Sequence, residues 1–317
     1  MNPFILAIDQ GTTGSRAFLF NRKAEVVASA YQEFPQYYPR PGWVEHDAEE
    51  IWQSCVAVIR RAVKEAGIAP KDISAVGITN QRETTVLWDR RTSRPVSRAV
   101  VWQCRRTAAL CESKKLRALA PVIRRKTGLV LDPYFSGTKI KWLLANVKGA
   151  RRRALKGELC FGTIDSWLIW KLTGGRSHMT DLTNASRTMI FNIRNHQWDP
   201  ELLKALDIPS EILPSAQKSG AVFGKTAPDI AGLSAGTPIA AVMGDQQASL
   251  FAQGGFVFQA TSDGRVKKTA LVEFSRPRPS GIIAIDLQEG NRLIGVGLTD
   301  GQCDILLFSD TGKVVRF

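Results

Sequence analysis

The chain has 317 residues, of which 44% are hydrophobic and 23% are charged, a composition typical of folded globular proteins that excludes long disordered regions. Its 43 Lys and Arg residues against 29 Asp and Glu residues give a net charge of +14, and residues 256–317 contribute only eight of the basic and seven of the acidic side chains. The excess is therefore spread over residues 1–255, which suits an anionic small-molecule substrate as well as a nucleic acid, so charge alone does not decide between these partners.

Cysteines, histidines and apolar runs restrict the compartment and the class of site. The five cysteines are odd in number and form no CxxC pair, which favours a reducing, cytoplasmic compartment. The apolar run 4–8 is too short for a secretory signal, and no segment has the length of a membrane span, so no membrane partner is expected. The three histidines lack carboxylate or cysteine partners at ligand spacing, which argues against a zinc site.

The first elements along the chain are a β-hairpin and an amphipathic helix. Residues 4–8 and 17–20 have the pattern of buried strands, and residues 9–16 between them are rich in Gly and hydroxyl side chains. Asp47 and Glu50 then predict an N-cap and a capping box at the start of a helix. The apolar positions that should face the core from this helix are Ile51, Cys55, Val58, Ile59, Ala62 and Val63.

Short strands and helices alternate over the rest of residues 1–255, and this alternation predicts an α/β domain. Further strands are expected at 75–79, 85–88, 99–102 and 238–243, and helices at 105–119, 136–147, 164–172 and from 245 to about 253. Residues 209–228 are rich in Pro and are expected to be irregular. After Gly254 and Gly255 the pattern changes to short alternating stretches punctuated by Gly, so residues 256–317 are predicted to form a separate all-β segment.

The predicted hairpin tip, residues 9–16, is a candidate anion-binding loop. Its glycines allow backbone N–H groups to converge on an anion, the hydroxyls of Thr12 and Thr13 add donors, and Arg16 adds a fixed positive charge. Asp9, at the end of the first strand, is placed to orient Mg²⁺ through a bound water. Taken by itself, the stretch fits an ordinary hairpin turn equally well.

Two further clusters follow buried strands. Arg82 and Glu83 come just after the strand 75–79, and their opposite charges suit hydrogen bonding to a polyol, although a surface ion pair is the commoner arrangement. Trp102 offers an aromatic wall or is simply part of the core. Asp245, between a strand and a helix, is placed either as a general base or as an N-cap.

Taken together and in order, these motifs resemble the N-terminal half of bacterial glycerol kinase, in the sugar-kinase branch of the actin-like ATPase (ribonuclease H-like) fold. The resemblance covers residues 1–255, and Gly14 stands where many members carry Ser. The motifs are Asp9-Gln-Gly-Thr-Thr13, Pro41-Gly-Trp-Val-Glu-His-Asp47, Gly77-Ile-Thr-Asn-Gln-Arg-Glu-Thr-Thr85, Trp102-Gln-Cys-Arg-Arg-Thr107, Asp132-Pro-Tyr-Phe-Ser-Gly-Thr138, Thr183-Asn-Ala-Ser-Arg-Thr188 and Gly244-Asp-Gln-Gln247.

The resemblance implies phosphorylation of glycerol to glycerol 3-phosphate by Mg-ATP. Asp245 would be the catalytic base, and Trp102 would pack on the glycerol carbons. Glycerol would be bound by Arg82, Glu83, Tyr134, Asp245 and Gln246. The phosphates of ATP would be contacted by Thr12, Thr13 and Arg16, and Asp9 would serve Mg²⁺ through water.

Residues 256–317 resemble one blade of the C-terminal β-pinwheel of the gyrase A protein of DNA gyrase. In the kinase family a second domain carrying the adenosine site follows instead, so we expect this chain to lack half of the nucleotide cleft and to be inactive alone. The surface that the second domain would cover is expected to promote self-association. The alternative is a chimeric or fused chain with a gyrase-like β module and no evolved joint activity, although one blade of net charge near +1 should bind DNA weakly.

Overall fold

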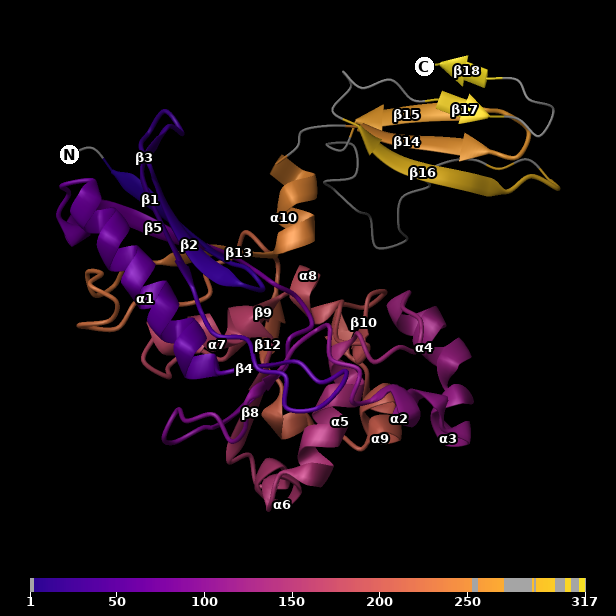
Figure 1. Cartoon of the computed structure of the whole chain (residues 1–317), viewed down its shortest axis with the longest axis horizontal. Helices are drawn as coiled ribbons and strands as arrows, with labels where there is room; N and C mark the ends of the chain where they lie inside the picture. The colour runs from indigo at the N-terminus through magenta and orange to yellow at the C-terminus, as the bar shows by residue number, and fades with distance from the viewer. Residues whose placement is uncertain are drawn as a thin grey trace. The chain divides into compact units, whose positions relative to one another are not determined.

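The computed structural model describes residues 3–252, 256–270, 287, 289–299, 306–308 and 314–316. The chain divides into two compact units, residues 1–245 and 246–317, and each is described by itself (Figure 1). In the first unit strands alternate with helices, whereas the described residues after 255 form strands and turns, so the expected α/β class with a small β segment is confirmed. The pair Gly254–Gly255 and the segments 273–278 and 281–284, on which part of the gyrase resemblance rests, lie outside the described residues.

A five-stranded sheet in the order β13-β5-β1-β2-β3 organises the first unit. The strands β1 (Phe4–Gln10), β2 (Gly14–Phe20) and β3 (Val26–Glu33) form an antiparallel meander. On the other side of β1, the strands β5 (Ile73–Asn80) and β13 (Ile239–Gly244) pair in parallel. Because β1, β5 and β13 run in the same direction, their carboxyl ends lie at the same edge of the sheet (Figure 1).

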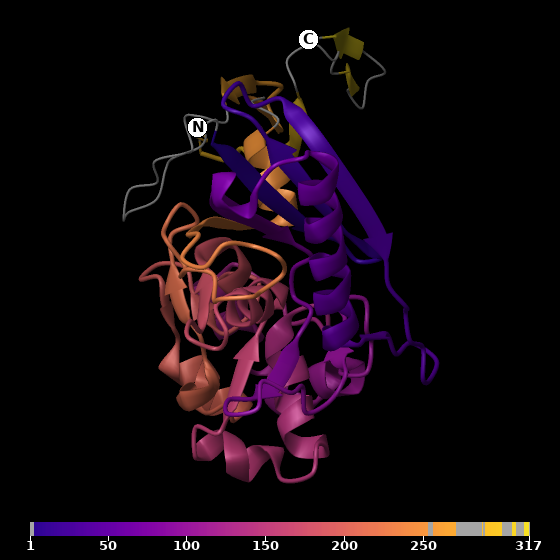
Figure 2. The ribbon, with the colours of Figure 1, turned by 90° about the vertical axis from the view of Figure 1, so that its left-hand side faces the viewer.

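The helix α1 (Ala48–Glu65) lies along one face of this sheet (Figures 1 and 2). All the predicted apolar positions of the helix are buried in the core between it and the sheet. Asp47 is the N-cap, as predicted, and accepts hydrogen bonds from the backbone N–H groups of Glu49 and Glu50. The predicted capping box is wrong, because the Glu50 carboxylate accepts a hydrogen bond from the Tyr37 hydroxyl at 2.8 Å instead.

Shorter elements complete the first unit and form a second apolar core around α5 and α9. The remaining strand pairs are β4 (Glu45–His46) with β7 (Ala99–Val100), β6 (Val86–Asp89) with β8 (Leu159–Gly162), β9 (Met179–Asp181) with β12 (Ser215–Gln217), and β10 (Phe191–Asn192) with β11 (Gln197–Trp198). The helices are α2 (Ala108–Glu112), α3 (Lys114–Arg117), α4 (Ala120–Thr127), α5 (Ser136–Asn146), α6 (Ala150–Leu155), α7 (Ile164–Leu172), α8 (Leu182–Ala185) and α9 (Pro200–Leu206), with 3-10 turns at Pro70–Asp72 and Ser210–Ile212. The helix α10 (Asp245–Ala252) begins at the last residue of the first unit and otherwise belongs to the second.

Two predicted segments differ from the structure. The expected helix 105–119 is divided into α2 and α3 because Ser113 has extended backbone angles (φ −59°, ψ 139°), and its hydroxyl accepts from the Leu116 N–H as the N-cap of α3. The segment 209–228, expected to be irregular, contains the strand β12, which pairs in parallel with β9. The first difference arises from local capping by Ser113 and the second from pairing with a distant strand. Hydrophobic periodicity reports neither.

In the second unit β14 (Phe256–Thr261) pairs antiparallel with β15 (Val266–Ala270) and with β16 (Leu293–Thr299). A further antiparallel pair joins β17 (Leu306–Phe308) to β18 (Val314–Arg316). Within the part of the chain that the structure describes, no helix combines the length and the apolar character needed to cross a membrane.

His46, at the end of β4, is fully buried beneath the hairpin tip. Its Nε2 atom lies 2.5 Å from Gln36 Oε1, and its ring packs edge-on against Phe34 with the centroids 5.1 Å apart. Burial disfavours the charged imidazolium and lowers the pKa of His46 from 6.5 to about 4. The folded protein therefore holds this side chain neutral.

We predict that the stability of the first unit depends on pH through His46. The unfolded chain takes up the proton first, so the stabilising contribution is present above pH 6.5 and is lost as the pH falls toward about 4. Relative to a His46→Asn variant, the wild-type protein should lose up to about 3 kcal/mol of unfolding free energy over this window. Urea unfolding followed by tryptophan fluorescence measures this, because all eight tryptophans precede residue 255. A difference between the two proteins that stays constant with pH would contradict the prediction.

Candidate active site

The carboxyl edge of the parallel strands brings together charged side chains that are far apart in the sequence. Asp9 is the penultimate residue of β1, Arg82 follows β5, and Asp245 follows β13 as the first residue of α10. The Arg82 Nε atom lies 3.2 Å from Asp245 Oδ1, and the two side chains are 12% and 38% exposed. This ion pair joins two strand ends that are separated by more than half of the chain.

Asp9 faces a mixed electrostatic environment. It is opposite Arg16 in the β1–β2 register and beside Thr79 of β5. Burial raises the pKa of Asp9, the Arg16 charge acts in the opposite direction, and the Asp245 carboxylate raises the pKa further. Two carboxylates near enough to repel each other suit a divalent cation that keeps most of its water, as Mg²⁺ does. Among the described residues no group of three or more His, Cys, Asp or Glu side chains is arranged to hold a metal ion.

The hairpin tip is tighter than predicted, because β1 extends to Gln10 and β2 begins at Gly14. The Gly11 N–H donates to the Gly14 carbonyl at 2.9 Å and closes the turn. The Thr12 hydroxyl accepts a hydrogen bond of 3.0 Å from the Trp102 indole N–H. Thr13 and Arg16 are exposed. The tip therefore presents the Thr13 hydroxyl and the Arg16 guanidinium to solvent, while the hydrogen bond from Trp102 holds Thr12.

The phenol end of Tyr31 on β3 lies against Gly14, so a side chain at position 14 would have to displace the Tyr31 ring. A Cβ atom added to Gly14 would lie 2.5 to 2.7 Å from the phenol end of Tyr31, which is closer than real contacts allow. The Arg16 guanidinium stacks over the same Tyr31 ring, 5.0 Å from its centroid. The departure from the Ser of many family members thus accompanies an aromatic side chain that occupies the space.

Glu83 is almost fully buried, with 1% exposure, and its backbone has the left-handed φ of +59°. Its Oε1 atom accepts a hydrogen bond of 2.6 Å from the Arg187 Nε, which forms an ion pair. Burial raises the pKa of Glu83, and the hydrogen bond and charge of Arg187 oppose this shift. The Arg187 guanidinium also stacks near Phe135, 5.0 Å from the ring centroid. Sequence reasoning did not select Arg187, although it lies within the quoted motif 183–188.

Aromatic side chains form a wall beside Glu83. The rings of Trp102 and Tyr134 lie with their centroids 5.4 Å apart and tilted by 57°. Burial raises the pKa of the Tyr134 hydroxyl, and the Glu83 charge adds to this. The Tyr134 ring centroid is also 5.8 Å from the Cζ atom of the Arg187 guanidinium. Glu83, Trp102 and Tyr134 are thus connected through ring contacts and through Arg187, and Arg82 is paired with Asp245. Gln246 falls in the second unit, and its role stays a prediction.

Residues 4–252 match the N-terminal domain of the FGGY family of carbohydrate kinases. The chain belongs to this family. The chain is 57% identical over 253 residues to glycerol kinase 2 of Thermotoga maritima, which covers 80% of the chain and 51% of that relative. It is also 57% identical over 251 residues to the glycerol kinase of Halothermothrix orenii, covering 79% of the chain and 50% of that protein. The chain therefore spans about half the length of these FGGY relatives.

Solved structures of two kinases share the fold of the first unit. The crystal structure of Plasmodium falciparum glycerol kinase with ADP superposes with a TM-score of 0.75 at 33% identity, covering 80% of this chain and 50% of that one. A gluconate kinase from Lactobacillus acidophilus superposes with a TM-score of 0.72 at 22% identity, covering 83% and 55%, which shows the fold alone. Residues 256–300 match the C-terminal β-propeller domain of DNA gyrase. The expected resemblances of both parts of the chain are confirmed.

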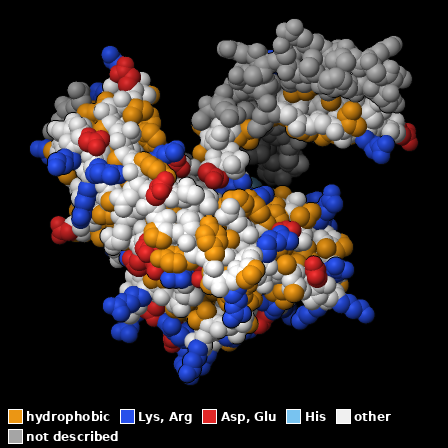
Figure 3. All heavy atoms as spheres, viewed as in Figure 1, with side chains coloured by type: hydrophobic (Ala, Val, Ile, Leu, Met, Phe, Trp, Pro, Cys, Tyr) orange, Lys and Arg blue, Asp and Glu red, His pale blue; other side chains and the backbone are white. Residues whose placement is uncertain are grey.

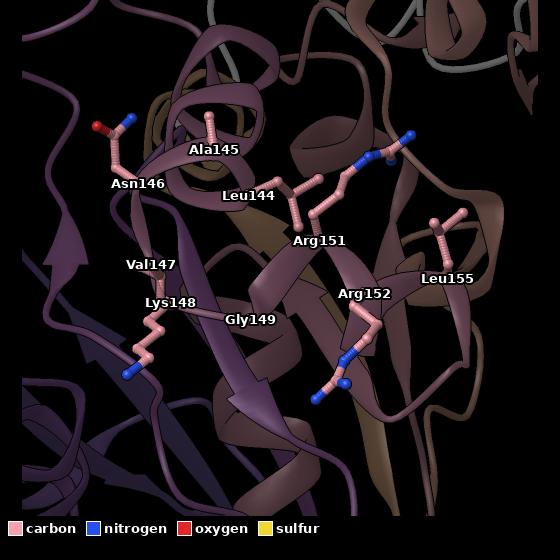
Figure 4. Close-up of a pocket in the computed structure, with 9 residues that line it drawn as sticks. All are labelled: Leu144, Ala145, Asn146, Val147, Lys148, Gly149, Arg151, Arg152 and Leu155. Atoms are coloured by element: carbon pink, nitrogen blue, oxygen red, sulfur yellow. The ribbon is translucent and has the colours of Figure 1, made fainter.

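The basic side chains of the first unit do not form a single patch on the face that Figure 3 shows. On the face shown in Figure 3, Lys and Arg side chains are scattered among acidic and hydrophobic ones over the first unit. A surface hollow of about 510 Å³ lies instead at the end of α5 and along α6, where Lys148, Arg151 and Arg152 surround it (Figure 4). No residue of the candidate site lines this hollow.

We predict that Arg187 is needed for stability because it compensates a buried charge. Arg187→Gln leaves the Glu83 carboxylate buried without its ion-pair partner, and we expect the free energy of unfolding to fall by about 3 kcal/mol. The matched control is Arg105→Gln, which removes an ion pair with Asp132 whose side chains are 58% and 36% exposed. The control should change the free energy by less than about 0.5 kcal/mol. Urea unfolding followed by tryptophan fluorescence compares the two, and equal losses would refute the assignment.

Proposed function

We propose that residues 1–255 form the glycerol and phosphate side of the cleft of an ATP:glycerol 3-phosphotransferase. The observation that carries the proposal is the meeting, at one sheet edge, of a polyol-type set of side chains and an anion-binding hairpin. The two parts are in direct contact, because the Trp102 indole donates to the Thr12 hydroxyl at 3.0 Å. Relatives 57% identical over four-fifths of the chain are named glycerol kinases, which supports the same substrate.

On the glycerol side, opposite charges are arranged to bind hydroxyl groups. The Arg82 guanidinium donates and the Glu83 carboxylate accepts, while Trp102 and Tyr134 cover the carbon chain. Asp245 acts as general base and takes the proton from the attacking hydroxyl at its carboxylate. The Arg82 Nε atom, 3.2 Å from Asp245 Oδ1, fixes the direction of this carboxylate. Gln246 is the further proposed glycerol ligand.

On the phosphate side, the hairpin supplies hydrogen-bond donors and forms no covalent bond with the phosphate. Thr12, Thr13 and Arg16 contact the phosphates of ATP, and Asp9 holds Mg²⁺ through water. Mg²⁺, when bound, neutralises charge that develops on the transferred phosphoryl group. As the new bond forms between the glycerol oxygen and the phosphorus, the bond to ADP breaks and the proton remains on Asp245.

The glycerol site makes a prediction for the chain of residues 1–317. We expect the wild-type chain to bind glycerol, and Glu83→Gln to weaken the binding about tenfold because a charged acceptor is lost. Chemical-shift changes of the Trp102 indole N–H during a glycerol titration measure the affinity. Glu211→Gln, which changes an exposed carboxylate outside the site, should leave the affinity unchanged. Absence of binding by the wild-type chain, or equal affinities in all three proteins, would sink the proposed site.

We further propose that residues 1–317 bind glycerol without transferring phosphate. Catalysis of phosphoryl transfer in a two-domain cleft needs closure of both domains to exclude water. Here the match to the N-terminal domain of the kinase family ends at residue 252, and residues 256–300 match a gyrase domain. Glycerol 3-phosphate formation with Mg-ATP, measured over a series of protein concentrations, should stay at the uncatalysed level. Product formation in proportion to the protein concentration would overturn this part of the proposal.

The match of residues 256–300 to a gyrase domain favours one second candidate, a fused or chimeric chain whose β module contacts duplex DNA. Residues 256–317 carry eight basic and seven acidic side chains, which gives little attraction for phosphates. An electrophoretic mobility-shift titration at several salt concentrations discriminates between the two candidates. Tight binding that weakens steeply with salt would support the DNA-binding candidate, and weak binding would dismiss it.

A further inference from the structure

Lys139 is a fully buried lysine next to the proposed glycerol site, and none of the roles above uses it. It lies in the first turns of α5 and has 0% exposure. Its Nζ atom donates to the backbone carbonyl of Tyr134 and, at 3.5 Å, to the backbone carbonyl of Glu83. The same ammonium therefore connects two segments that carry proposed glycerol ligands.

Full burial at this position is energetically unfavourable for a lysine. Burying an ammonium group costs free energy, and a Met side chain would fill the same space without that cost. Burial lowers the pKa of Lys139 to about 7, although the nearby charge of Glu83 opposes the shift. The two carbonyl contacts compensate part of the cost. Because Lys139 donates to these two backbone carbonyls, its presence is better explained by the geometry of the Glu83 and Tyr134 segments that it fixes than by packing.

The Glu83 carbonyl is the point at which several donors converge. Besides Lys139, the Ser136 hydroxyl donates to it at 3.0 Å and the Thr85 hydroxyl at 3.1 Å. Glu83 has the left-handed φ of +59°, which is unfavourable for a residue with a side chain. A conformation of this kind persists only where the surroundings over-determine it. The three donors supply that restraint, and the restraint fixes the direction in which the Glu83 carboxylate leaves the backbone.

We propose that Lys139, assisted by Ser136, is the positioning residue of the polyol site, setting the separation between Glu83 and Tyr134 and thereby the affinity for glycerol. The inference rests on the proposed function, because it concerns the same site. Lys139 does not touch the polyol and acts through the backbone of the two ligand residues.

The test compares two lysines on the same helix. Lys139→Met removes the donor with little change of volume, and we expect glycerol binding about tenfold weaker. The matched control is Lys141→Met, because Lys141 also donates to a backbone carbonyl, that of Leu206 at 3.2 Å, outside the site. The control should change the glycerol affinity less than about twofold. Equal affinities in Lys139→Met and the wild-type chain would overturn the proposal.

A double-mutant cycle separates positioning from general structural damage. In a Glu83→Ala background the carboxylate that Lys139 places is absent, so Lys139→Met should then weaken glycerol binding by less than about threefold. A tenfold loss in both backgrounds would show a merely structural role and refute the proposal. Where Lys139→Met does not fold, as judged by tryptophan fluorescence, Ser136→Ala replaces it in the same cycle, with an expected loss of about threefold in the wild-type background and no loss in the Glu83→Ala background. A threefold loss in both backgrounds would then refute the proposal. Failure of the wild-type chain to bind glycerol would overturn the proposed function itself, whereas binding that is insensitive to residues 136 and 139 would overturn only this inference.

Discussion

The parallel pairing of β5 with β1 and with β13 is the constraint on which the site depends. It places Gln10, Asn80 and Gly244 side by side at the carboxyl ends of the three strands. Asn80 then exchanges two side-chain hydrogen bonds of 3.0 Å with Asn184, which ties the segment carrying Arg187 to the same edge. Next to it, the Thr183 hydroxyl accepts from the Gly244 N–H at 2.8 Å and so holds the start of α10. A shift of one residue in either pairing would separate the charged groups that the edge now brings together.

A buried polar network makes this edge rigid. The Gln81 side-chain amide donates to Gln10 Oε1 at 3.0 Å and to the Gly11 carbonyl at 3.1 Å, and its own oxygen accepts from the Thr84 hydroxyl at 2.8 Å. The hairpin tip and the loop that carries Arg82 and Glu83 are therefore held by one side chain. Networks of this kind are stabilising only when nearly every member is satisfied, which gives the loop a single conformation. The left-handed backbone of Glu83 is one feature that this rigidity allows.

The sequence predicts the features that local pattern controls. The apolar stripe of α1 and its Asp47 cap follow from periodicity and capping chemistry, and four of the five strands of the sheet follow from short apolar runs. The fifth, β3, is mostly exposed and was not predicted. The orientation of the Arg187 side chain cannot be predicted from local pattern, because its partner Glu83 is 104 residues away in the chain and becomes a neighbour only through the sheet. Motif order identified the family, yet the buried role of Lys139 and the contact between Tyr31 and Gly14 depend on side chains meeting across elements. Such contacts are properties of the packed structure, and periodicity contains no information about them.

The indole of Trp102 contacts both sides of the proposed site. Its ring packs against Tyr134, and its N–H group is bonded to the Thr12 hydroxyl of the hairpin tip. A ligand that orders this ring from one side reduces the conformational entropy that remains to be lost when a ligand binds from the other side. In the proposed site, thermodynamic linkage would make such an effect reciprocal between glycerol and the phosphates of ATP. A single hydrogen bond thus ties the position of the indole ring to that of the hairpin tip.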